Sequence, residues 1–182
     1  MRVCGVDPGL NRTGYGVIRV DASGRRTALV EAGVIRTAAE ADLADRLAEL
    51  ARAMDEVLAE HPPDLVGLEQ LYSHYRHPRT AILMGHARGV LLLSAARAGV
   101  SVVSLSPARI KRTLTGNGRA NKGQMQRAVM ATLNLSELPE PSDVADALAI
   151  ALCAGLEVAS GRPTSGRSRT RGRPAELRGT RS

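Results

Sequence analysis

The chain has 182 residues, 43% of them hydrophobic but only 2% aromatic, which suits one domain with an aliphatic core. Its formal net charge is +7, and seven Arg and one Glu give residues 160–182 a net charge of +6. Two cysteines exclude a disulfide framework, and the absence of an apolar run of roughly 20 residues excludes a membrane span. With no secretory signal in the sequence, we expect a cytoplasmic protein.

The first part of the chain predicts three strands, a helix and a fourth strand. The three strands are expected at residues 1–6, 14–20 and 27–36, and turn residues between them favour an antiparallel meander. Apolar residues three to four apart then predict a helix at residues 40–60. The fourth strand, at residues 64–70, is short and ends in Glu69 and Gln70.

The second part predicts a fifth strand among four helices. We expect helices at residues 79–98, 107–114, 122–133 and 142–159, with the strand at 99–105. From residue 160 onward Arg, Gly, Ser, Thr and Pro dominate, which predicts a disordered tail over residues 160–182. Strands that alternate with helices after a meander predict one α/β domain over residues 1–159, with helices on both faces of a five-stranded sheet.

Four carboxylates fall at positions that can converge in such a domain. Asp7 and Glu69 end the first and fourth predicted strands, and Asp143 and Asp146 lie three apart at a helix start. Crowded carboxylates need a cation to offset their repulsion. Hard oxygen ligands suit Mg²⁺ or Mn²⁺, and two such ions could clamp a phosphodiester for attack by water.

Each carboxylate also has a purely structural interpretation. Asp7 could serve only the Pro-Gly turn that follows it, and Asp143 and Asp146 could complement a helix N-terminus. Glu69 fits a structural role less well, because it follows an apolar run and is the only charge between Asp64 and Arg76.

A basic stretch lies between these acids. Residues 70–136 contain ten Arg or Lys and no Asp or Glu, which favours a surface for a polyanion over a merely solvated face. Lys111 and Lys122 are the only lysines and both fall here, which predicts that these two places require an amine. Arg112 and Arg119 lie beside them, and a loop-to-helix junction at Lys122 could hold a phosphate.

Two further segments bear on partners. The loop after Glu69 contains Tyr72, Tyr75 and Arg76. The two tyrosine rings could stack on a base or only pack on the domain surface. Small or apolar residues recur every four positions in the next helix, at Ala81, Gly85, Gly89 and Leu93. That stripe would suit either the core or a dimer interface.

Seven short segments together resemble the RuvC-type Holliday junction resolvases of bacteria over about residues 1–158. They are Gly5-Val6-Asp7-Pro8-Gly9, Gly14-Tyr15-Gly16-Val17, Glu69-Gln70, Gly85-His86-Ala87-Arg88-Gly89, Pro107-Ala108-Arg109-Ile110-Lys111, Gly116-x-Gly118-x-Ala120-x-Lys122 and Asp143-x-x-Asp146-Ala147-Leu148-Ala149-Ile150-Ala151. Each segment is short, but their order and spacing together are specific.

The resemblance implies an RNase H-like fold with a mixed sheet, and a homodimer that cuts four-way DNA junctions by paired symmetric nicks with Mg²⁺ as cofactor. It implies that the catalytic, metal-binding carboxylates are Asp7, Glu69, Asp143 and Asp146. It places Lys111 and Lys122 at the DNA near the scissile region. Tyr72 stands where the family usually has Phe, and some relatives carry His in place of Asp143. The RuvA–RuvB branch-migration motor is the partner that the resemblance suggests.

Two other functions remain open on the residues alone. A phosphotransferase of the actin and sugar-kinase type can also begin with a strand, an Asp-x-Gly turn and a Gly-rich hairpin, as residues 6–16 do. The chain is short for two such domains. A DNA-binding module without chemistry is the other alternative, but four carboxylates would weaken DNA binding unless metal ions covered them.

Overall fold

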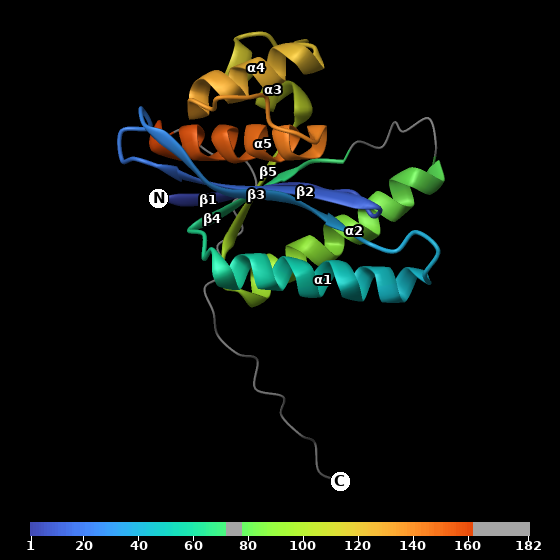
Figure 1. The fold of residues 1–182 in the computed structure, drawn as a ribbon. Helices are drawn as coiled ribbons and strands as arrows, with labels where there is room; N and C mark the ends of the chain where they lie inside the picture. The colour runs from blue at the N-terminus through green and yellow to red at the C-terminus, as the bar shows by residue number, and fades with distance from the viewer. Residues whose placement is uncertain (72–77, 162–182) are drawn as a thin grey trace.

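The computed structural model describes residues 1–71 and 78–161 and shows a five-stranded mixed sheet with helices on both faces (Figure 1). The strands lie in the order β3-β2-β1-β4-β5. Their bounds are Arg2–Asp7 for β1, Arg12–Val20 for β2, Thr27–Arg36 for β3, Leu65–Glu69 for β4 and Ser101–Leu105 for β5. The helices are α1 at Leu43–Glu60, α2 at Pro78–Arg97, α3 at Pro107–Thr115, α4 at Lys122–Leu133 and α5 at Ser142–Ala159.

Strand direction brings two predicted site residues to one edge of the sheet. β1, β2 and β3 form the expected antiparallel meander, whereas β4 runs parallel to β1 and to β5. Val6 pairs with Leu68 in the register of β1 and β4. The next residues, Asp7 and Glu69, therefore end two adjacent parallel strands side by side.

The helices form two layers that enclose separate halves of the core. α3, α4 and α5 cover one face of the sheet, and α1 and α2 cover the other (Figure 1). α1 is amphipathic and buries Leu50, Met54 and Leu58. α5 is apolar almost all round and is largely buried, which is typical of a central helix.

Glycines let α5 lie directly on the sheet. A Cβ atom at Gly5 would come within 2.1 Å of the Ala147 carbonyl oxygen, and one at Gly14 within 2.1 Å of the Asp143 carbonyl oxygen. Any larger residue at these positions would push α5 away from β1 and β2. This close packing brings the first turns of α5 to the ends of β1 and β4.

The predicted boundaries differ from the observed ones by two or more residues at three places, and by one residue at several others. β2 begins at Arg12, two residues earlier than expected. α1 begins at Leu43 rather than at residue 40, because Asp42 is its extended N-cap. β5 begins at Ser101, because the preceding Gly99 adopts a positive φ of 70° that a strand does not accommodate.

Three further features concern the cysteines, the end of α5 and the possibility of a membrane-spanning helix. Cys4 and Cys153 are buried free thiols, as the aliphatic core requires. α5 ends at Ala159, and residues 162–182 of the predicted tail lie outside the described part of the chain. None of the described helices is long and apolar enough to cross a membrane.

Candidate active site

The predicted acidic residues approach one another at the carboxyl ends of β1 and β4. Asp7 and Glu69 supply the centre of this group, and their side chains are hydrogen-bonded to each other. Asp146 and Asp143 enter from the first two turns of α5. All three neighbours act electrostatically on Asp7, so the structure brings the four predicted carboxylates into one cluster.

Asp7 carries the strongest perturbation in this cluster. Burial, together with the negative charges of Glu69, Asp146 and Asp143, raises its pKa to about 8. A buried carboxyl surrounded by other carboxylates retains its proton because the charged form is poorly solvated and repelled. Such a perturbed acid among other carboxylates is a typical mark of a functional site.

Two lysines oppose this negative charge. Burial raises the pKa of Glu69, and the nearby Asp146 raises it further, whereas the hydrogen bond from Asp7 and the charge of Lys111 lower it. Burial also raises the pKa of Asp146, while Lys122 and Lys111 lower it. The two lysines of the chain therefore both act electrostatically on the acidic cluster.

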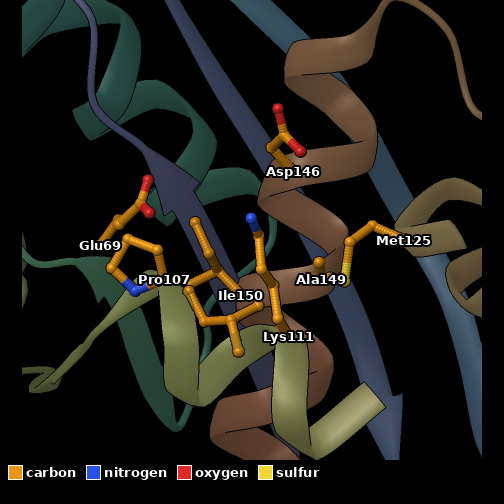
Figure 2. Close-up of a pocket in the computed structure, with 8 residues that line it drawn as sticks. Glu69, Pro107, Lys111, Met125, Asp146, Ala149 and Ile150 are labelled. Atoms are coloured by element: carbon orange, nitrogen blue, oxygen red, sulfur yellow. The ribbon is translucent and has the colours of Figure 1, made fainter. Parts of the chain in front are cut away.

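A cavity of about 230 Å³ opens beside these groups. Figure 2 shows Lys111 extending from α3 into the region between Glu69 and Asp146. The rest of the lining is mostly apolar and comes from Pro107, Ile110, Met125, Ala149 and Ile150. The cavity thus combines two carboxylates, one ammonium group and an apolar wall, which suits a ligand that is charged on one side.

The carboxylates fit a divalent metal in chemical type but are not arranged as a ligand set. Within residues 1–71 and 78–161, no three His, Cys, Asp or Glu side chains are grouped closely enough to hold a metal ion. Asp7 and Glu69 bond to each other, and Asp143 forms an ion pair with Arg12 at 2.7 Å. Hard oxygen donors and the repulsion around Asp7 nonetheless match Mg²⁺ or Mn²⁺. The four expected ligands therefore form a neighbourhood of acids and not an assembled set of metal ligands.

The other predicted DNA-binding residues lie at the periphery or outside the described structure. Lys122 is the first residue of α4, whose N-terminus is closed by a capping box between Asn121 and Gln124. Arg112 packs its guanidinium against Gly118, and Arg119 is exposed in the loop before α4. Neither arginine lines the cavity. Tyr72, Tyr75 and Arg76 fall within residues 72–77, which are outside the described part of the chain.

Two arginines of the site received no role from the sequence, although Arg88 lies in the Gly85–Gly89 segment that carries the family resemblance. Arg12 pairs with Asp143 through its Nη2 atom. Arg88 of α2 donates from Nε to the backbone oxygen of Glu69 at 3.1 Å and from Nη2 to Ser104 Oγ at 2.7 Å. Arg88 could have been suspected from its place in the acid-free stretch, whereas no local pattern marks Arg12.

A mixed sheet in this strand order, with carboxylates where β1 and β4 end and with helices on both faces, defines an RNase H-like α/β enzyme. The family of crossover junction endodeoxyribonuclease RuvC matches residues 3–154, and the chain belongs to that family. It is therefore a metal-dependent DNA endonuclease. This membership decides against the phosphotransferase and against a DNA-binding module without chemistry.

One relative and two structures of another illustrate the similarity. The crossover junction endodeoxyribonuclease RuvC of Rhodopirellula baltica is 56% identical over 151 residues, which cover 83% of this chain and 84% of the relative. The Thermus thermophilus RuvC structure superposes with a TM-score of 0.82 at 34% identity, covering 88% of this chain and 97% of that one. A structure of T. thermophilus RuvC in complex with a Holliday junction substrate gives a TM-score of 0.81 at 32% identity, with the same coverage.

Proposed function

We propose that this endonuclease resolves four-way DNA junctions in recombination and repair by paired symmetric nicks on opposing strands. The observation that carries the proposal is the Asp7–Glu69 pair at adjacent strand ends, beside a cavity that also holds Asp146 and Lys111. The junction complex of the T. thermophilus relative supports the choice of substrate.

In this proposal Asp7, Glu69, Asp143 and Asp146 are catalytic and hold two Mg²⁺ ions, for which Mn²⁺ substitutes. When bound, such ions polarise a phosphodiester and activate water for in-line attack. The four side chains act as ionised oxygen donors, so the proton that burial keeps on Asp7 has to leave first. Asp143 has to turn from Arg12 if it is to contribute a donor oxygen.

The lysines act on the DNA rather than on the metal. Lys111 and Lys122 carry compact ammonium groups beside Glu69 and Asp146, where they would contact phosphate oxygens next to the scissile bond. The apolar wall of the cavity would exclude water from one side of the reacting group. Both features favour a phosphodiester held in one orientation.

Further DNA contacts are assigned to the periphery. Arg112 and Arg119 would bind backbone phosphates near α3 and α4. Tyr72, Tyr75 and Arg76 would meet the junction where bases can be stacked on aromatic rings. We assign residues 1–159 to the nuclease domain and residues 160–182 to a basic tail that adds non-specific affinity for DNA.

A homodimer would supply the second active site that paired nicks require. The stripe on α2 supports this assembly, because a Cβ atom at Gly85 or Gly89 would meet no atom within 4 Å. The neighbouring Ile82 and Leu93 are 60% and 49% exposed. The glycines of this stripe are thus not covered by the described core, which leaves the dimer as the role we propose for them. We further propose that the protein acts in the cytoplasm. We propose the RuvA–RuvB branch-migration motor as its partner.

The test compares a synthetic four-way junction with a linear duplex of the same sequence, in Mg²⁺ or Mn²⁺. We expect symmetric nicks in the junction alone. Asp7→Asn should abolish them while retaining or improving junction binding, because the substitution removes negative charge that would otherwise oppose the DNA. Equal cutting of both substrates would contradict the junction selectivity, and retained cleavage by Asp7→Asn would contradict the metal assignment.

A further inference from the structure

We propose that Arg12 is an internal counter-cation of the active site, and that it lowers metal affinity by competing with a divalent ion for Asp143. The inference rests on the proposed metal-dependent function and adds a residue that the function did not require. Arg12 would be a positioning residue, since it acts through Asp143 and not on the reacting phosphate. Its role would be to set the metal concentration at which the site becomes loaded.

The contact itself has the geometry of a charge-assisted hydrogen bond. Arg12 Nη2 lies 2.7 Å from Asp143 Oδ2, and the two side chains are 45% and 25% exposed. Asp143 in turn acts electrostatically on Asp7 and on Asp146. Arg12 therefore binds one oxygen of a carboxylate that belongs to the acidic cluster.

The backbone around Arg12 is fixed, so the guanidinium is presented from a defined place. Thr13 is fully buried, and its hydroxyl donates to the Gly9 carbonyl oxygen at 2.6 Å. The Thr37 hydroxyl donates to the Leu10 carbonyl oxygen, also at 2.6 Å. On the other side, the missing Cβ of Gly14 allows the backbone of Asp143 to lie against β2. Both partners of the ion pair thus stand on rigid elements.

Competition follows from the number of oxygen atoms available. A guanidinium at 2.7 Å occupies Asp143 Oδ2, and a metal ion that needs the same oxygen must displace it. Arg12 also adds a positive charge close to the place where a divalent cation would bind. The ion pair is partly exposed, so the expected effect on metal affinity is modest, about two- to fivefold.

The experiment measures Mn²⁺ binding to the full-length, DNA-free protein by electron paramagnetic resonance of the free ion, which is independent of cleavage. We expect Arg12→Gln to lower the dissociation constant for Mn²⁺ by about two- to fivefold. Arg12→Lys, which keeps the charge, should stay closer to the wild type. Arg19→Gln is the matched control, since Arg19 is exposed on the same strand.

A double-mutant cycle separates direct competition from a general electrostatic field. In an Asp143→Asn background, Arg12→Gln should no longer change Mn²⁺ affinity. The inference is overturned if Arg12→Gln leaves Mn²⁺ binding unchanged or weakens it, or if it tightens binding equally in the Asp143→Asn background. A wild-type protein that binds no Mn²⁺ would overturn the proposed metal site together with this inference.

Discussion

The carboxyl groups of Asp7 and Glu69 lie within hydrogen-bonding reach of each other across the ends of two adjacent parallel strands, an approach that favours a protonated Asp7. Burial and three neighbouring carboxylates raise the pKa of Asp7 to about 8. The site therefore favours added positive charge. The folded protein supplies part of that charge through Lys111, Lys122 and Arg12. Crowded, buried carboxylates of this kind lower the stability of the folded protein but are needed for its activity.

The first prediction concerns stability as a function of pH without metal. The unfolded pKa of an Asp is about 3.9, so between pH 4 and pH 8 the folded state binds more protons at Asp7 than the unfolded state does. Stability must therefore fall as the pH rises through this window. The raised pKa values of Glu69 and Asp146 act in the same direction. In EDTA we expect Tm to decrease from pH 5 to pH 8.

Asp7→Asn provides the check on this prediction. The amide has no charge to desolvate, so the variant should be more stable than the wild type at pH 8 and should show a flatter profile. About 1 kcal/mol would correspond to a rise in Tm of roughly 2–4 °C for a domain of this size. Glu56→Gln, on the exposed side of α1, serves as the control. A wild-type profile in Asp7→Asn would mean that Asp7 is ionised in the folded protein.

The second prediction concerns the choice of lysine. Lys111→Arg keeps the positive charge but replaces a compact ammonium by a wider guanidinium in the cavity between Glu69 and Asp146 (Figure 2). We expect the single-turnover rate of junction cleavage to fall roughly ten- to hundredfold, because the reacting groups are displaced. Arg52→Lys, the converse exchange at an exposed residue of α1 on the opposite face of the sheet, should change the rate little. Equal rates for wild type and Lys111→Arg would mean that only charge matters at this position.

Much of the active-site neighbourhood could be predicted, because strand ends and helix starts are local features of a sequence. The positions of Asp7 and Glu69 at strand ends, and of Asp143 and Asp146 at a helix start, all follow from short patterns. The fold class was confirmed for the same reason. The boundaries of α1 and β5 were wrong by two or three residues, because an N-cap at Asp42 and a positive φ at Gly99 decide them.

Side-chain pairing across the fold could not be predicted. Arg12 and Asp143 are distant in the sequence, and they meet only because Gly14 lets α5 approach β2. Arg88 reaches the backbone of Glu69 only because α2 packs beneath the ends of β4 and β5. These contacts depend on register and on packing distance, for which the sequence offers no periodic signal.

The third prediction tests Arg88 as a support for the site. Its guanidinium joins α2 to the carbonyl oxygen of Glu69 and to Ser104, and burial lowers the pKa of Arg88. Arg88→Met keeps an unbranched stem like that of arginine but removes both hydrogen bonds, which should destabilise the protein by about 1–3 kcal/mol. Thermal unfolding measures this loss, and Arg97→Met at the exposed end of the same helix is the control.

Cleavage by Arg88→Met distinguishes a local role from a purely structural one. If Arg88 positions Glu69, kcat should fall well below the wild-type value at a temperature where the variant is fully folded. KM for the junction should change less, because Arg88 lies behind the strand end that carries Glu69. A variant that is destabilised but has wild-type kcat would show that the contact stabilises the fold without positioning the carboxylate.

The last prediction concerns the arginine-rich segment after α5. Residues 162–182 carry seven Arg and one Glu, so they should bind the DNA backbone without regard to sequence. Truncation after Gly161 leaves α5 and its C-cap Ser160 intact. We expect weaker binding to linear duplex and a flatter dependence of log K on log salt, because fewer counterions are released. The rate of junction cleavage at saturating protein should stay at the wild-type value. Fluorescence anisotropy over a range of salt concentrations measures the slope, and an unchanged slope would mean that the segment makes no contact with DNA.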